Sequence, residues 1–352
     1  MARLFVALLA SLLAGLALGR AAEPVTLSGR AMGTTWSAKF FVAPPPAPAL
    51  DPASVTARLA AALEHLATLF STYRPDSALS RFNASSSTDW YPVSPELARV
   101  AHEARRISEL TDGAFDVTID PLVRLWGFGP AGRRHTLPSD TEIATARSGV
   151  GYRRLSARIS PPALRKASAE LSADFSSLAK GFAADTLSDL LTALGAPDHF
   201  VQIGGDIKTA GSHPWRAGIE SPPAFAVPAA PRPNATPSPP ALALIVALSG
   251  HALSTSGEAH NFMTVAGRRY GHILDPRTGR PVAHGLASVS VIHASCAASS
   301  ALATALFVLG PDAGFALASR EHVAALFLVR DGARPVPRAT PEFARLSPSV
   351  PR

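Results

Sequence analysis

Apolar residues recur every three or four positions in three segments of the chain, which is the spacing of an amphipathic helix. The first segment covers residues 51–71, the second begins at Ser94 and stops before Gly113, and the third follows the sequence SADFSS and ends at Gly195. Proline after a polar residue suits a helix start, and glycine suits the position after a helix end. We therefore predict a helix over each segment.

Other segments alternate apolar and polar residues, which is typical of strands with one buried face. They are, in chain order, VTLSGRAMGTTWSAKFFVA, HFVQIGGDIKTAG, PWRAGIES, ALALIVALSGHALSTSG and RRYGHILDPRTG. Near the C-terminus an alternating strand precedes the apolar helix SALATALFVLG, a short helix near residues 312–319 and a last strand at HVAALFLV. Because helices and strands follow one another in irregular order, the pattern predicts an α+β fold.

Two proline-rich stretches are not expected to join the core. Residues 222–240 lie between two predicted strands, and we expect a long exposed loop there because proline cannot donate to a strand ladder. Residues 332–352 are rich in proline and arginine, and we expect them to form a disordered tail.

Residues 1–21 have the pattern of a secretory signal peptide, with Arg3 before an apolar run that extends from Leu4 to Gly19. An uncleaved membrane anchor is the alternative, although the run is shorter than the ~20 residues that span a bilayer comfortably. No cysteine stands directly after the run, so we expect no lipid anchor, and because Cys296 is the only cysteine in the chain we expect no intramolecular disulfide. These features predict an exported, periplasmic protein.

Composition argues against one class of partner. The chain has 352 residues, of which 47% are hydrophobic, and a formal charge of +7. A basic balance can favour nucleic acid, but the arginines form no stripe interleaved with aromatic residues, and no nucleic-acid-binding motif is present. We therefore predict a globular protein, large enough for an enzyme, that binds no nucleic acid. The sequence assigns no oligomeric state.

Polar residues gather at the ends of predicted elements in TDGAFDVTIDP, DFSSLAKGFAAD, VQIGGDI and GHILDPRTG, where a backbone can approach a ligand. Lys180 falls in the first turn of its predicted helix, where the dipole disfavours a cation, so a nearby anion would explain it. Solvation of a lone lysine at a helix end is the alternative. His272 and Asp275 also admit two interpretations, because core histidines and aspartates in turns before proline are common.

Taken in order, eight motifs of this chain resemble those of the FAD:protein FMN transferase family, also called ApbE-like. They are MGTTW, STYRPDSALSRFN, TDGAFDVTIDPLVRLWGFG, DFSSLAKGFAAD, IGGDI, STSGE, HILDPRTGRPV and ALATALFVLG, and they extend from about Met32 to Gly310. The resemblance implies that residues 22–331 form one two-lobed α+β domain with mixed or antiparallel sheets flanked by helices. It implies a Mg²⁺-dependent enzyme that transfers the FMN of FAD through a phosphoester bond to a threonine or serine of an exported or membrane flavoprotein and releases AMP.

The resemblance also implies roles for single residues. Those that would bind the cofactor are Met32, Tyr73, Ala114, Phe115, Asp116, Asp174, Lys180 and Ile273. His272 and Asp275 would be catalytic, with His272 as the candidate for proton transfer at the acceptor hydroxyl. The pyrophosphate of FAD would then be the anion near Lys180.

For the metal ion, the resemblance implies three ligands, the backbone carbonyl of Ser177 and the side chains of Ser300 and Thr304. The family usually has an aspartate where this chain has Ser300, and a hydroxyl is a weaker ligand for a hard dication than a carboxylate. Three hypotheses follow: an active transferase whose metal is held largely by FAD phosphates, a flavin-binding relative that has lost turnover, and an FAD pyrophosphatase that releases FMN and AMP.

Overall fold

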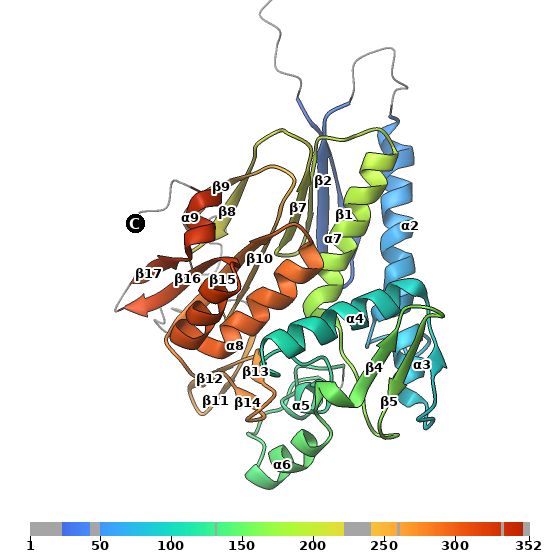
Figure 1. The fold of residues 1–352 in the computed structure, drawn as a ribbon, viewed down its shortest axis with the longest axis vertical. Helices are drawn as coiled ribbons and strands as arrows, with labels where there is room; N and C mark the ends of the chain where they lie inside the picture. Colours follow the sequence, from blue (N-terminus) through green and yellow to red (C-terminus); the bar gives the residue numbers. More distant parts are fainter. Residues whose placement is uncertain are drawn as a thin grey trace, which may run out of the picture.

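An eight-stranded sheet runs through the computed structural model, which describes residues 23–42, 50–130, 132–221, 241–258, 261–331 and 334–347 (Figure 1). Neighbouring strands are antiparallel and follow the order β1-β2-β6-β7-β10-β15-β16-β17. They are β1 (Val25–Ala31), β2 (Thr34–Phe40), β6 (His199–Ile203), β7 (Asp206–Ala210), β10 (Ala252–Gly257), β15 (Leu286–His293), β16 (Ala324–Asp331) and β17 (Arg334–Ala339).

Two hairpin turns of this sheet lie at the same end. Met32 joins β1 to β2 with a φ of 50°, and Gly204 joins β6 to β7 with a φ of 57°. Strand β2 pairs with β6 through Trp36 and Ile203, and the Gly204 N–H donates to the Thr35 carbonyl at 2.9 Å. The motifs MGTTW and IGGDI, which are far apart in the sequence, are therefore neighbours in space.

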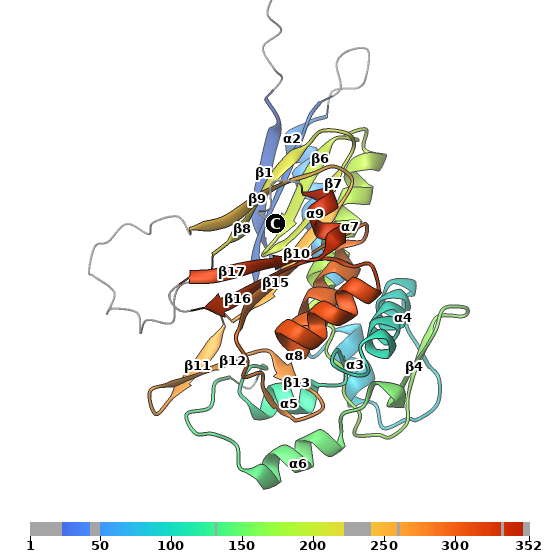
Figure 2. The same cartoon turned by 60° about the vertical axis from the view of Figure 1, so that its left-hand side comes forward.

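Three long helices pack on one face of the sheet, and a fourth packs against two of them (Figures 1 and 2). They are α2 (Pro52–Phe70), α4 (Pro95–Leu110), α7 (Ser176–Ala193) and α8 (Cys296–Arg320). Asp51 caps α2 and Ser94 caps α4, each accepting backbone N–H groups of the first turn. The three helices predicted from apolar spacing are thus confirmed.

Helix α8 consists of two helical pieces, because Gly310 interrupts it with a φ of 84° and is followed by Pro311. This break confirms the predicted order of a helix and a short helix. Among the described residues α8 is the one helix long and apolar enough to cross a membrane, but 61% of its most apolar stretch is buried. It packs against β10, β15 and β16, which is the position of a core helix.

The opposite face of the sheet is covered by the hairpin β8 (Trp215–Glu220) and β9 (Leu242–Leu248) and by α9 (Pro341–Leu346). Trp215, Val246 and Phe343 are buried there. The prediction of a disordered tail is therefore wrong for residues 334–347. The prolines of β17 lie on an edge strand of the sheet, where proline is tolerated, and Phe343 anchors α9 in the second core.

A second lobe, at the lower end of Figures 1 and 2, is built from short elements. Its helices are α3 (Ala78–Ala84), α5 (Asp120–Leu125) and α6 (Asp140–Ser148), with a 3₁₀ turn at Tyr152–Arg154. Its strands are β3 (Tyr91–Pro92), β4 (Leu155–Arg158), β5 (Ala163–Lys166), β11 (Phe262–Val265), β12 (Arg268–Gly271), β13 (Leu274–Asp275) and β14 (Arg280–Pro281). The predicted α+β class is confirmed. The predicted signal peptide and the proline-rich segment 222–240 lie outside the described residues.

Candidate active site

The three predicted metal ligands meet where α7 begins and α8 has passed its first turn. The Ser300 hydroxyl donates to the Ser177 carbonyl at 2.7 Å. The Thr304 hydroxyl donates to the Ser300 carbonyl at 3.1 Å and lies 3.0 Å from the hydroxyl of Ser256 on β10. The structure thus brings Ser177, Ser300 and Thr304 together and adds Ser256, which the sequence had not singled out as a ligand.

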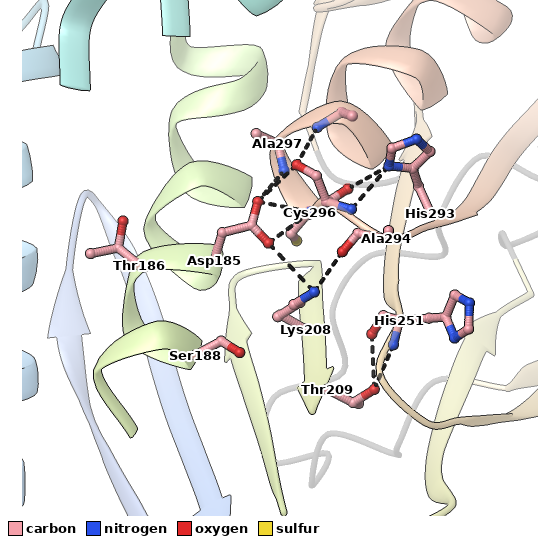
Figure 3. A network of polar contacts seen from close by, with 12 residues as sticks. Asp185, Thr186, Ser188, Lys208, Thr209, His251, His293, Ala294, Cys296 and Ala297 are labelled. Carbon is pink, nitrogen blue, oxygen red and sulfur yellow. Dashed lines mark hydrogen bonds and ion pairs between the residues drawn. The ribbon is translucent and has the colours of Figure 1, made fainter. Parts of the chain in front are cut away.

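Residues spaced by four along α7 hold α8 in register. Ser177 contacts Ser300, and Gly181, one turn later, faces the backbone of Cys296 so closely that a Cβ would overlap the carbonyl group. Asp185, another turn along, binds the start of α8 (Figure 3). The two helices therefore run against each other with a register that places Ser177 opposite Ser300.

The Asp185 carboxylate caps α8. It accepts the N–H groups of Cys296 at 2.9 Å and Ala297 at 3.1 Å and the Ser295 hydroxyl at 2.9 Å (Figure 3). Burial raises the pKa of Asp185, whereas these hydrogen bonds and Lys208, whose Nζ lies 4.0 Å away, oppose the increase. The first N–H groups of α8, which could otherwise bind a phosphate, are therefore bound by the protein itself.

We expect Gly181→Ala to lower the free energy of unfolding by about 1–3 kcal/mol, because overpacking forces the helices apart. Urea denaturation followed by circular dichroism would measure the change. Gly285→Ala is the matched control, since a Cβ at Gly285 meets open space. An equal loss of stability in both variants would contradict the close contact between α7 and α8.

Lys180 lies on α7 within one turn of Ser177 and faces the hairpin that joins β6 to β7. Its Nζ is 3.9 Å from Oδ2 of Asp206 and 3.5 Å from the Ser176 carbonyl. Asp206 is only 4% exposed, whereas 36% of the Lys180 side chain is exposed. Lys180 therefore has a buried counter-charge on one side and solvent on the other, where an anion can approach.

Asp174 lies at the start of the same region, two residues before α7. Its carboxylate accepts the Ser176 N–H at 2.8 Å. Burial raises the pKa of Asp174, and the charge of Asp120 acts in the same direction, whereas Lys180 lowers it. The charges of Asp120 and Lys180 therefore both act on the Asp174 carboxylate.

His272 follows the hairpin β11–β12, and both its backbone N–H and its Nδ1 contact the Asn261 carbonyl, at 3.1 and 3.0 Å. Because a carbonyl oxygen only accepts, Nδ1 carries the hydrogen and Nε2 carries a lone pair. Burial lowers the pKa of His272, and the charge of Lys180 lowers it further, although the Asn261 contact opposes this. At pH 7 His272 is therefore neutral, with Nε2 as its basic atom.

Asp275 is bound within its own turn. Its Oδ1 accepts the backbone N–H of Arg277 at 2.9 Å, and its Oδ2 accepts the Arg277 guanidinium at 2.9 Å. Its carbonyl accepts the Gly279 N–H at 2.8 Å. These contacts match the turn-forming alternative, and a catalytic role for Asp275 stays a prediction.

Comparison with known proteins identifies the family to which this chain belongs. The model of the ApbE family matches residues 32–327. The chain belongs to the ApbE family. It is 37% identical over 326 residues to the FAD:protein FMN transferase of Vibrio cholerae and 34% identical over 318 residues to that of Escherichia coli K12. The alignments cover 92% of this chain and 92% of the Vibrio protein, and 89% of this chain and 86% of the E. coli protein.

Solved structures of ApbE proteins share the fold. The apo flavinyl transferase ApbE of Pseudomonas stutzeri superposes with a TM-score of 0.81 at 38% identity, over 94% of this chain and 98% of that one. The flavin transferase ApbE of Vibrio cholerae gives a TM-score of 0.81 at 35% identity, over 92% of this chain and 99% of that one. These neighbours confirm the ApbE-like fold.

The cofactor-binding positions predicted from the resemblance to the ApbE family differ in exposure. Tyr73 is 68% exposed, and Met32 is partly buried at its hairpin turn. Ala114, Phe115 and Ile273 are buried, with exposures of 1%, 3% and 7%. Their contact with a flavin stays a prediction.

Asp116, another of these positions, is bound by the protein. It accepts the Thr118 N–H at 2.7 Å, the Thr118 hydroxyl at 2.6 Å and the Tyr152 N–H at 2.7 Å. Burial raises its pKa while these bonds oppose the increase. The Asp116 side chain thus stabilises its loop and links it to Tyr152. Its role toward the cofactor also stays a prediction.

The oxygen atoms between α7 and α8 fit magnesium in type but carry no charge. Within the described ranges, no group of three or more His, Cys, Asp or Glu residues could hold a metal ion. Magnesium prefers oxygen ligands and is often held by one or two carboxylates together with substrate phosphates. Ser177, Ser300 and Thr304 therefore fit a magnesium ion whose positive charge is balanced by a bound pyrophosphate.

Sequence reasoning missed Asp185 as part of this site. The motif DFSSLAKGFAAD places Ser177, Gly181 and Asp185 four residues apart, which puts them on one face of a helix. That spacing was a signal that these residues share a partner. The sequence did not identify α8 as that partner, because the contact joins residues more than 100 positions apart.

Proposed function

We propose that this chain transfers the FMN half of FAD to the hydroxyl group of a threonine or serine in an acceptor protein. As a member of the ApbE family it is a transferase, and its relatives are named for the transfer of FMN from FAD to protein. The observation that carries the mechanism is the contact of His272 Nδ1 with the Asn261 carbonyl at 3.0 Å, which leaves the lone pair on Nε2, while burial lowers the pKa of the ring.

In the proposed reaction the acceptor oxygen attacks the phosphorus atom of the FMN half. The bond from that phosphorus to the bridging oxygen breaks, and its electron pair leaves with AMP. Nε2 of His272 takes the proton of the acceptor hydroxyl. A phosphoester thus replaces one phosphoanhydride bond, with no oxidation or reduction. A base placed in this way contributes about 10²–10⁴-fold to the rate.

Lys180 is proposed to bind the pyrophosphate. Asp206 holds its ammonium group at 3.9 Å, a separation longer than a tight hydrogen bond, so the N–H groups stay available to phosphate oxygens. Asp174 would contact the ribityl side of FMN, and Ile273 would pack on the ring system. Positioning and charge neutralisation of this kind supply most of the catalysis in phosphoryl transfer.

Magnesium is the proposed accompanying ion. The Ser177 carbonyl and the hydroxyls of Ser300 and Thr304 would hold it, together with phosphate oxygens. When bound it neutralises charge on the pyrophosphate and on the departing AMP. Because the ligands from the protein are neutral, we expect the ion to bind with FAD rather than before it.

The proposed acceptor is an exported or membrane flavoprotein. The support for this compartment is the signal-peptide pattern of residues 1–21, which predicts export to the periplasm. An acceptor in the same compartment needs an accessible segment with a threonine or serine that can approach Nε2 of His272.

Release of AMP distinguishes the proposed transferase from its alternatives. The purified chain would be incubated with FAD and magnesium, with and without an acceptor domain, and AMP measured by chromatography. The transferase releases AMP only when the acceptor is present. AMP in both samples would favour the pyrophosphatase, and bound FAD without AMP in either sample would favour a flavin-binding protein that has lost turnover.

A further inference from the structure

The segment that carries Asp174, residues 171–174, is fastened by groups from several motifs. The Asp174 N–H donates to the Val117 carbonyl at 2.7 Å, and the Ser172 hydroxyl donates to Asp120 at 2.6 Å. These two contacts tie the segment to the loop TDGAFDVTIDP. Neither contact involves Ala173, whose backbone is bound by another element.

Asn83, at the end of α3, sets that position. Its amide nitrogen donates to the Ala173 carbonyl at 2.8 Å, and its amide oxygen accepts the Ala173 N–H at 2.9 Å. One side chain thus binds both backbone groups of the residue before Asp174, as a neighbouring strand would. The two residues are 90 positions apart in the chain, so this contact joins separate parts of the fold.

Lys166 binds the backbone carbonyl of Asn83. Its ammonium group donates to the Asn83 carbonyl at 3.0 Å and to the Ala169 carbonyl at 2.8 Å, and it lies 3.5 Å from the Leu171 carbonyl. Lys166 is 1% exposed, so its charge is bound by carbonyl oxygens rather than by solvent. It therefore joins the end of α3 to the beginning of the segment that Asn83 holds.

We infer that Asn83 is a positioning residue for FAD binding, and that Lys166 holds Asn83 in place. Asn83 fixes the backbone of Ala173 and with it the direction of the neighbouring Asp174 side chain. This inference rests on the proposed function, because it takes Asp174 as a contact of FAD. Loss of the paired hydrogen bonds from Asn83 would let the Asp174 side chain move from its position, and a contact that is held less precisely binds FAD less tightly.

The test compares FAD binding by Asn83→Ala with binding by the unchanged chain. We expect the Kd for FAD, measured by flavin fluorescence, to rise about tenfold, while kcat at saturating FAD changes less than about twofold. Ser85→Ala is the matched control, because Ser85 also lies at the end of α3 and its hydroxyl accepts the local N–H of Ser87. An unchanged Kd in Asn83→Ala, or an equal rise in Ser85→Ala, would overturn the inference.

Asn83→Asp gives a second test that does not depend on the stability of the alanine variant. An ionised aspartate presents an oxygen to the Ala173 carbonyl and repels it, whereas a protonated aspartate donates a hydrogen bond as asparagine does. At pH 7, where an ordinary aspartate is ionised, the variant's Kd for FAD should therefore exceed that of the unchanged chain. Equal Kd values in the variant and the unchanged chain at pH 7 would contradict a positioning role.

Failure of this inference and failure of the proposed function give different results. If the unchanged chain does not bind FAD, the proposed function fails. If it binds FAD and Asn83→Ala binds equally well, the function stands and the positioning role is wrong.

Discussion

Replacing His272 with asparagine is expected to lower the rate of FMN transfer by about a thousandfold while FAD still binds. Asparagine keeps a donor that can reach the Asn261 carbonyl, but it has no basic atom in place of Nε2. The proton of the acceptor hydroxyl would then pass to water. The rate at saturating FAD and the Kd for FAD, measured separately, distinguish lost catalysis from lost binding.

The pH dependence of the FMN-transfer rate shows whether the lost activity of His272→Asn comes from the loss of a base. Because burial lowers the pKa of His272, the unchanged chain should keep its full rate to below pH 6.5, the ordinary value for histidine, and lose it only at more acidic pH. The asparagine variant should lack this acidic decline. A variant that transfers FMN at the normal rate, or that keeps the decline, would remove His272 from the mechanism.

Replacing Ser300 with aspartate is expected to raise the affinity for magnesium in the absence of FAD by about ten- to a hundredfold, or 1.4–2.7 kcal/mol. The new carboxylate would lie beside the Ser177 carbonyl and near the Thr304 hydroxyl, which supplies the charged ligand that the site lacks. Without metal the carboxylate faces the carbonyl of Ser177, so the melting temperature should fall and then recover when magnesium is added.

Isothermal titration with magnesium measures this change, and Ser300→Asn is the matched neutral control. The asparagine variant should bind magnesium as weakly as the unchanged chain. Equal affinities in the aspartate variant and in the unchanged chain would show that the ion is held elsewhere. If the aspartate variant also transfers FMN much faster, the serine has impaired the native metal site.

Local sequence patterns predicted the helices but not all of their partners. The spacing of Val55, Leu59, Leu66 and Phe70 predicted α2, since apolar periodicity is a local property. The contact between Asp185 and the start of α8 was not predicted, because nothing local to either element specifies it. The same holds for Asn83, whose partner is 90 residues away.

The tail shows how composition can mislead. Pro335 and Pro337 predicted disorder, but both lie in the edge strand β17, which needs hydrogen bonds on one side only. The large apolar side chain of Phe343 was the signal in the sequence, and the structure buries it in the core.

The candidate site came mainly from the resemblance to a family. The resemblance implied Ser177, Ser300 and Thr304 as metal ligands; the structure brings them together, and their role as ligands stays a prediction. For Lys180, helix position left both a nearby anion and simple solvation open, and the structure adds Asp206 as a counter-charge. Side-chain chemistry such as the Nδ1 hydrogen of His272 depends on a carbonyl eleven residues away and needed the folded chain.

The most direct test of the proposed transfer is the intact mass of an acceptor domain after incubation with this chain, FAD and magnesium. We expect a gain of one FMN phosphoester on the acceptor and no gain on a variant whose target threonine or serine is replaced by alanine. An unchanged acceptor mass, with FAD shown to be bound and an ApbE relative modifying the same acceptor in parallel, would contradict the proposed transfer.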